Sequence, residues 1–189
     1  GNMGLPVVLY AFGSAGFAFG ITVMVTVSLF QFTVGSVMAS QGNALKTLAR
    51  TPTVYAIVIS LALLLTDTSL PRWLDNSVDL ISGFTVPLML ITLGVSLASI
   101  QVRSLKSGVG FSLVRIPVAA GLAWGIGALL GLPPLAQSIL VLQMSMPVAV
   151  FNYLFAQKAG REPAYVASLV FCSTLLALFY LPLLLAWLM

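Results

Sequence analysis

Two apolar stretches, far apart in the chain, share one pattern: GNMGLPVVLY at residues 1–10 and LQMSMPVAVF at residues 142–151. Each carries an amide, a small residue and a proline at the same spacing. The aligned pairs are Asn2 with Gln143, Gly4 with Ser145, and Pro6 with Pro147. Proline lacks an N–H and clashes with the preceding turn, so it breaks or kinks a helix. The recurrence of the same polar neighbours favours two helix breaks of one kind over two simple kinks.

The composition predicts the environment of these stretches. The 189-residue chain is 60% hydrophobic and 6% charged, whereas soluble domains contain roughly 25% charged residues. Its mean hydropathy of +1.11 predicts an all-α integral membrane protein. The sequence contains no histidine, which excludes imidazole metal sites and Ser-His-Asp triads. The net charge of +4 is spread singly among loops, so we expect no nucleic acid, metal or cofactor as a partner.

Largely apolar runs of about 20 residues predict membrane-spanning helices. We expect a half-helix at 2–13 followed by full spans, all helical because the runs lack the alternation of barrel strands. The spans are expected at about 15–39, 52–66, 78–100, 108–131, 134–157 (broken near 146) and 164–188. Together they form a single domain, 1–189.

The loops predict how the chain is oriented in the membrane. Basic residues gather in alternate loops, at 40–51, 101–107 and 158–163. The positive-inside rule places these loops in the cytoplasm and the C-terminus on the outer side. The two proline motifs then run in opposite directions, as in an inverted repeat. A second match, SLFQ at 28–31 with ALFY at 177–180, lies one helix beyond each motif.

The depth of the breaks suggests a site. At 1.5 Å per residue, residues 6–13 cover about 12 Å of helix and residues 134–145 about 18 Å, each near half of a roughly 30 Å hydrocarbon core. Half-helices that start at this depth present free N–H groups and positive dipole ends, which suit a carboxylate. We therefore predict a substrate-binding site at the crossing of the breaks. Its expected residues are Asn2, Gly4, Pro6, Gln143, Ser145 and Pro147.

Two charged residues have competing interpretations. Arg115 lies inside a span, and we expect it to snorkel to the inner headgroups, with a substrate counter-charge as the alternative. Asp79 lies near the outer end of the span 78–100. It is the first candidate for proton coupling, although a solvated carboxylate near a helix start is the simpler interpretation.

Three stretches carry a resemblance to a known family: GNMGLP at 1–6, PLMLITLGVSLAS at 87–99 and QMSMPVAVFNYLFAQKAGREP at 143–163. They resemble the auxin efflux carrier family, and more narrowly its bacterial malate or malonate permease-like members, relatives of the plant PIN carriers. The resemblance implies ten helices in two inverted repeats, with the fourth and ninth broken at prolines that cross. Pro6 and Pro147 would then be those breaks, and the chain looks like a fragment without the first three helices. Plant members carry Asn-Pro-Asn at the crossover, so we do not expect auxin as the substrate.

These observations predict a secondary active or facilitative transporter of a small mono- or dicarboxylate, such as malate or malonate, working by alternating access. The resemblance implies the bacterial inner membrane, and a homodimer is compatible with the sequence. The alternatives are a relative of bile-acid-type sodium symporters and a non-transporting membrane scaffold fragment. An intramembrane enzyme is disfavoured, because no span has an acidic residue at its centre and histidine is missing.

Overall fold

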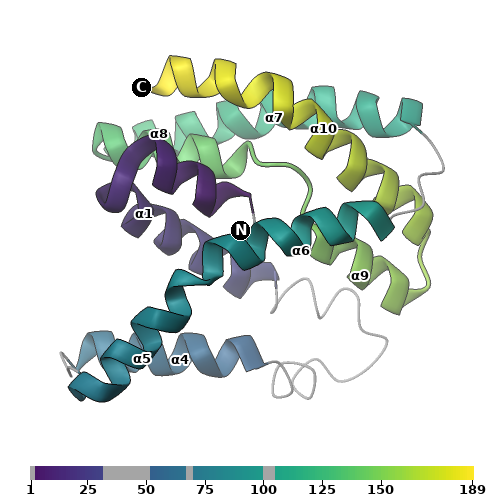
Figure 1. Cartoon of the computed structure of the whole chain (residues 1–189). Helices are drawn as coiled ribbons and strands as arrows, with labels where there is room; N and C mark the ends of the chain where they lie inside the picture. The colour runs from purple at the N-terminus through teal and green to yellow at the C-terminus, as the bar shows by residue number, and fades with distance from the viewer. Residues whose placement is uncertain (1–2, 32–51, 67–69, 100–104) are drawn as a thin grey trace.

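The computed structural model describes residues 3–31, 52–66, 70–99 and 105–189, and within these ranges every regular element is an α-helix (Figure 1). The helices are α1 Gly4–Phe30, α4 Pro52–Leu65, α5 Arg72–Gly83, α6 Thr85–Ser99, α7 Leu105–Leu129, α8 Pro134–Met144, α9 Val150–Ala159 and α10 Pro163–Leu188. Within the described residues, four stretches are long and apolar enough to cross a membrane: Gly4–Phe30, Arg72–Thr92, Leu105–Leu129 and Pro163–Leu188. The chain is therefore a multi-pass membrane protein. The expected loop at 40–51 lies outside the described residues.

α1 is folded into two limbs. Gly13 has φ 65° and ψ −162°, in the middle of what is otherwise continuous helix. This backbone conformation is open almost only to glycine, because any Cβ is strained there. The limbs fold back on each other, since a Cβ at Gly20 would lie 3.2 Å from side-chain atoms of both Leu5 and Val8. The sequence predicts a half-helix ending at residue 13 and a span from residue 15, and the bend lies at that point.

The predicted span 78–100 differs in the structure. Two helices, α5 and α6, occupy this region, and the first begins at Arg72 rather than at residue 78. Phe84 separates them, and its N–H donates to the carbonyl of Ile81 at 3.1 Å. Pro87 accounts for the interruption, because its ring has no N–H and clashes with the carbonyl four residues earlier, on Gly83.

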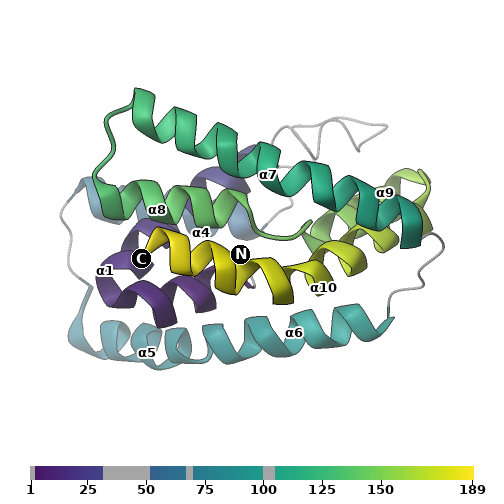
Figure 2. The same ribbon diagram turned by 90° about the horizontal axis from the view of Figure 1, so that it is seen from above.

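The remaining helices form a bundle. α7 packs against α8 and α10, α1 packs against α8, and α9 packs against α10. Figure 2 shows α8 between α7 and the first limb of α1, with α10 alongside. A buried apolar cluster joins α1, α8 and α10, and consists of Val8, Ile139, Leu142, Met146, Ala177 and Leu181. Small buried residues such as Gly16 and Gly108 let the helices approach closely, as is usual in membranes.

The helices α4, α5 and α6 lie outside the bundle that α1 and α7 to α10 form. α5 has no buried residue and packs against α6. α4 and α5 overlap in Figure 1 but lie apart in Figure 2. Large apolar side chains on α5 and α6 are exposed, with Ile81 on α5 at 70% and Ile91 on α6 at 62%. In a membrane protein such surfaces are suited to lipid or to other helices.

Candidate functional site

A non-helical break interrupts the chain between α8 and α9. α8 ends at Met144 and α9 begins at Val150, so residues 145–149 are not helical. α8 has 11 residues, which correspond to about 16 Å and place the break near the middle of a roughly 30 Å hydrocarbon core. The break that the sequence analysis expects near residue 146 falls within these residues. The new half-helix starts at Val150, and Ala149 before it is still extended at φ −65° and ψ 137°.

Side chains from α7 and α10 bind the backbone of the break. The Tyr180 hydroxyl donates to the Ser145 carbonyl at 2.5 Å, and Nη1 of Arg115 donates to the Met146 carbonyl at 2.7 Å. The Val148 N–H donates to Oγ of Ser173 at 3.0 Å. Ser145, Met146 and Val148 are buried, and in hydrocarbon each polar backbone group needs a protein partner. These hydrogen bonds explain how the chain stays non-helical at this depth.

The environment of Arg115 corrects the sequence prediction. At 1.5 Å per residue, Arg115 lies about 15 Å along α7 from Leu105. This is much further from the start of the helix than the single turn from which the side chain could reach the headgroups. The snorkelling prediction is therefore wrong, since the guanidinium contacts the Met146 carbonyl at the break. A cation at the centre of a spanning helix costs about 2.5–3.5 kcal/mol in membrane insertion. The carbonyl dipole offsets part of that cost.

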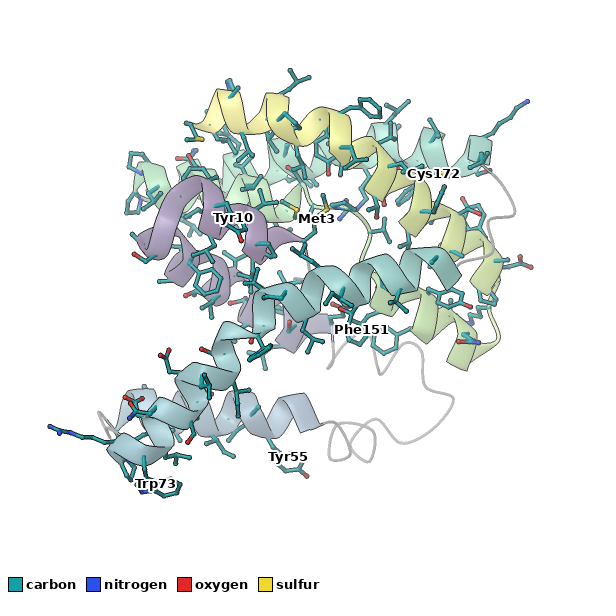
Figure 3. The ribbon with its side chains drawn as sticks, viewed as in Figure 1. Met3, Tyr10, Tyr55, Trp73, Phe151 and Cys172 are labelled. Carbon is teal, nitrogen blue, oxygen red and sulfur yellow. The ribbon has the colours of Figure 1, made fainter. Side chains whose placement is uncertain are left out.

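The first proline motif forms the start of α1. The helix begins at Gly4, and Pro6 lies in its first turn, where a missing N–H leaves no hydrogen bond unmade. Both residues are buried. Asn2 lies outside the described residues. Met3, labelled in Figure 3, packs against the apolar cluster that includes Met146.

The two motifs meet in space. A Cβ on Gly4 would overlap Oε1 of Gln143 and lie 3.1 Å from its Cδ and 3.3 Å from Cγ of Met146. The Gln143 amide also donates through Nε2 to the Gly20 carbonyl at 3.4 Å. The amide therefore lies between the two limbs of α1. Its contact with the start of the helix requires glycine at position 4, because any larger side chain would displace it.

The other predicted site residues have different surroundings. The hydroxyl of Ser145 donates to the Val141 carbonyl of its own helix at 2.7 Å, and the side chain is fully buried. Pro147 lies in the break and is half-buried. Asp79 is exposed on α5, outside the bundle that holds the breaks. The structure thus brings Gly4, Gln143 and the residues near Ser145 together, and does not bring Asp79 to them.

Sequence analysis assigns no role to Tyr180 or Ser173, although one signal pointed to Tyr180. Tyr180 ends the ALFY match, in which it is aligned with Gln31. Both residues make polar contacts with the broken helix: Tyr180 with the break itself, and Nε2 of Gln31 with Oδ1 of Asn152 at 3.5 Å. A hydroxyl or amide in an apolar span needs a protein partner, so these aligned positions could have been identified.

Apolar helices long enough to cross a membrane, together with a broken helix whose backbone is bound by polar side chains, are typical of membrane transporters. The chain belongs to the family described as membrane transport protein, whose model matches residues 36–185. The resemblance to the auxin efflux carrier family is thereby confirmed.

Two archaeal relatives agree with this membership. An uncharacterized transporter of Methanocaldococcus jannaschii is 26% identical over 94% of this chain and 61% of the relative. An uncharacterized transporter of Methanothermobacter thermautotrophicus is 29% identical over 97% of this chain and 62% of the relative. The chain thus spans about three fifths of the length of the curated relatives that it matches. No solved structure shows a significant match.

Proposed function

We propose that this protein is a secondary active or facilitative carrier of a small organic anion, a mono- or dicarboxylate such as malate or malonate. Membership in a transporter family implies transport rather than catalysis. The observation that carries the proposal is the break at 145–149, which lies at mid-depth against the start of α1. A broken helix of this kind is where many carriers bind their substrate.

The chemistry of the break favours an anion over a cation. The carbonyls of Ser145 and Met146 already accept hydrogen bonds from Tyr180 and Arg115. Backbone carbonyls are what an unwound segment offers to Na⁺, and here a positive charge and a hydroxyl occupy these two. The same arrangement leaves the positive end of α9 and the Arg115 guanidinium beside the break. This argues against sodium binding at these carbonyls and supports a carboxylate substrate.

We further propose that the two proline motifs belong to inverted repeats of a ten-helix carrier. Two contacts support this proposal: Gly4 lies near Met146, and Gly16 lies near Ile139. From Gly4 to the bend at Gly13 the first limb of α1 therefore runs antiparallel to α8, and the second limb then returns along it, with Gly20 again next to Gln143. Alternating access around the crossing would then carry the anion across the inner membrane, with the C-terminus outside.

The test is uptake of radiolabelled malate and malonate into proteoliposomes that contain the purified protein in the full length that its gene encodes. Asn2→Ala, Gln143→Ala and Pro147→Ala should abolish uptake while the amount of folded protein stays unchanged. Gln157→Ala is the matched control, because it removes an exposed amide from α9 away from the break. Uptake that persists in all three site variants would refute the assignment of these residues.

Two narrower expectations stay predictions. Asp79 as the proton-coupling group predicts that Asp79→Asn removes the dependence of uptake on a proton gradient, even though this residue lies on α5. Homodimer formation predicts twice the monomer mass for the protein in detergent. Neither expectation affects the assignment of the site at the break.

A further inference from the structure

Arg115 places a permanent positive charge directly beside the break. Its guanidinium is charged at every physiological pH, and Nη1 lies 2.7 Å from the Met146 carbonyl. Arg115 is half-buried on α7, which packs against both α8 and α10. The charge is therefore held by the bundle at the level of the break, and it is separated from the exposed ends of the helices.

The hydrogen bond to Met146 uses a small part of what this side chain offers. A guanidinium carries five N–H donors in a planar fork, and the structure shows a hydrogen bond from Nη1. A carbonyl is a dipole and does not neutralise a full charge. The acidic residues in the described part of the chain, Asp75, Asp79 and Glu162, are all exposed. Among the described residues, the charge at the break is thus matched by a dipole and not by a buried carboxylate.

We propose that Arg115 determines the specificity of the site by binding the carboxylate of the transported anion through the N–H groups that Met146 does not use. The inference rests on the proposed function, because it assigns the counter-charge for the anionic substrate. A planar fork suits this double task, since one edge can stay on the carbonyl while another donates hydrogen bonds to a carboxylate. Tyr180 has a different role: its neutral hydroxyl positions the same segment through Ser145.

This difference provides a matched pair of variants. Arg115→Gln removes the charge but keeps a polar group near Met146, whereas Tyr180→Phe removes a neutral hydrogen bond to the neighbouring carbonyl. The measurement is uptake of radiolabelled malonate by the full-length protein in proteoliposomes, with KM and maximal rate determined separately. We expect Arg115→Gln to raise KM at least about tenfold, the effect of losing a charge-assisted hydrogen bond. Tyr180→Phe should leave KM within about twofold of the wild type, because it removes no contact with the substrate.

The uptake measurements distinguish failure of the proposed function from failure of the inference about Arg115. If wild-type protein takes up neither malate nor malonate, the proposed function fails and the inference fails with it. If the wild type transports malonate but Arg115→Gln has an unchanged KM and loses only maximal rate, then Arg115 is solely a support for the break. That result overturns the inference and leaves the proposed function standing.

A second variant covers the case in which Arg115→Gln does not fold. Arg115→Lys keeps the charge, but an ammonium cannot hold a carbonyl and a carboxylate in one planar fork. We expect it to fold, to transport malonate, and to show a KM raised about three- to tenfold. In this case a KM equal to that of the wild type would overturn the inference.

Discussion

Gly108 is a point of close approach between α7 and α10, and it offers a sharp test of the bundle. A Cβ at this position would lie 2.6 Å from Sγ of Cys172, 2.7 Å from the Ser168 carbonyl and 2.9 Å from Cβ of Cys172. A carbon and a carbonyl oxygen normally stay at least about 3.3 Å apart. Because one of these neighbours is backbone, a rotamer change cannot relieve the overlap, and the helices must separate by several tenths of an ångström.

The magnitude follows from comparison with Gly110, which lies on the same helix with nothing within 4 Å of its Cβ position. Gly110→Ala should gain about 0.5–1 kcal/mol, because alanine loses less backbone freedom on folding than glycine does. Gly108→Ala gains the same amount but suffers overpacking of about 1–3 kcal/mol. With a backbone clash we expect the upper part of that range, so the two variants should differ by about 2–3 kcal/mol.

The assay is thermal unfolding in detergent, followed by tryptophan fluorescence, since Trp124 lies on α7. A difference of this size corresponds to roughly 4–12 °C in Tm for a chain of this length. Cys172→Gly in the Gly108→Ala background should recover part of the loss, because it removes the contacts with Cys172 and leaves the Ser168 carbonyl in place. Equal Tm values for Gly108→Ala and Gly110→Ala would refute the close packing of α7 and α10.

Three further variants test the positions that shape the breaks. Gly13→Ala should destabilise the protein by about 1–3 kcal/mol in thermal unfolding, because alanine is strained at a φ of 65°. The effect is expected even though nothing lies within 4 Å of the added Cβ, and an unchanged Tm would contradict the bend. Tyr180→Phe leaves the buried Ser145 carbonyl without its partner and should cost about 1–3 kcal/mol by the same measurement, a loss that should be absent if water replaces the hydroxyl. Gly4→Ala should displace the Gln143 amide and lower malonate uptake by tenfold or more, whereas Gly94→Ala, with open space around it, should leave uptake unchanged.

The position of the break could be predicted from the sequence, because proline acts locally. Pro147 cannot continue a helix, and the structure has its gap at 145–149. The partners of the break could not be predicted in the same way. Arg115 and Tyr180 lie 31 and 35 residues from the carbonyls that they contact, and such contacts depend on which faces of the helices meet.

The two wrong expectations have similar causes. Arg115 was expected to reach the headgroups from a span starting at residue 108, but α7 begins at Leu105, so the residue lies deeper. The stretch that contains Pro87 was expected to form a single span, 78–100, yet it is interrupted at Phe84. In both cases the residue type was informative, and a shift of a few residues at a helix boundary changed what it does. Gly4 meets Gln143 in the structure, while the repeat relation of the two motifs and their role toward a substrate stay predictions.

The hydrogen bonds at the break also have a consequence for how the protein is made. Synthesis proceeds from the N-terminus, so α7 with Arg115 enters the membrane before the break is formed. α10, which supplies Ser173 and Tyr180, is made after it. At 11 residues α8 is too short to be recognised as a spanning helix by itself. Until α10 inserts, the Val148 N–H and the Ser145 carbonyl must find water or the translocation machinery as temporary partners, and the last helix of the chain completes the insertion of the one before it.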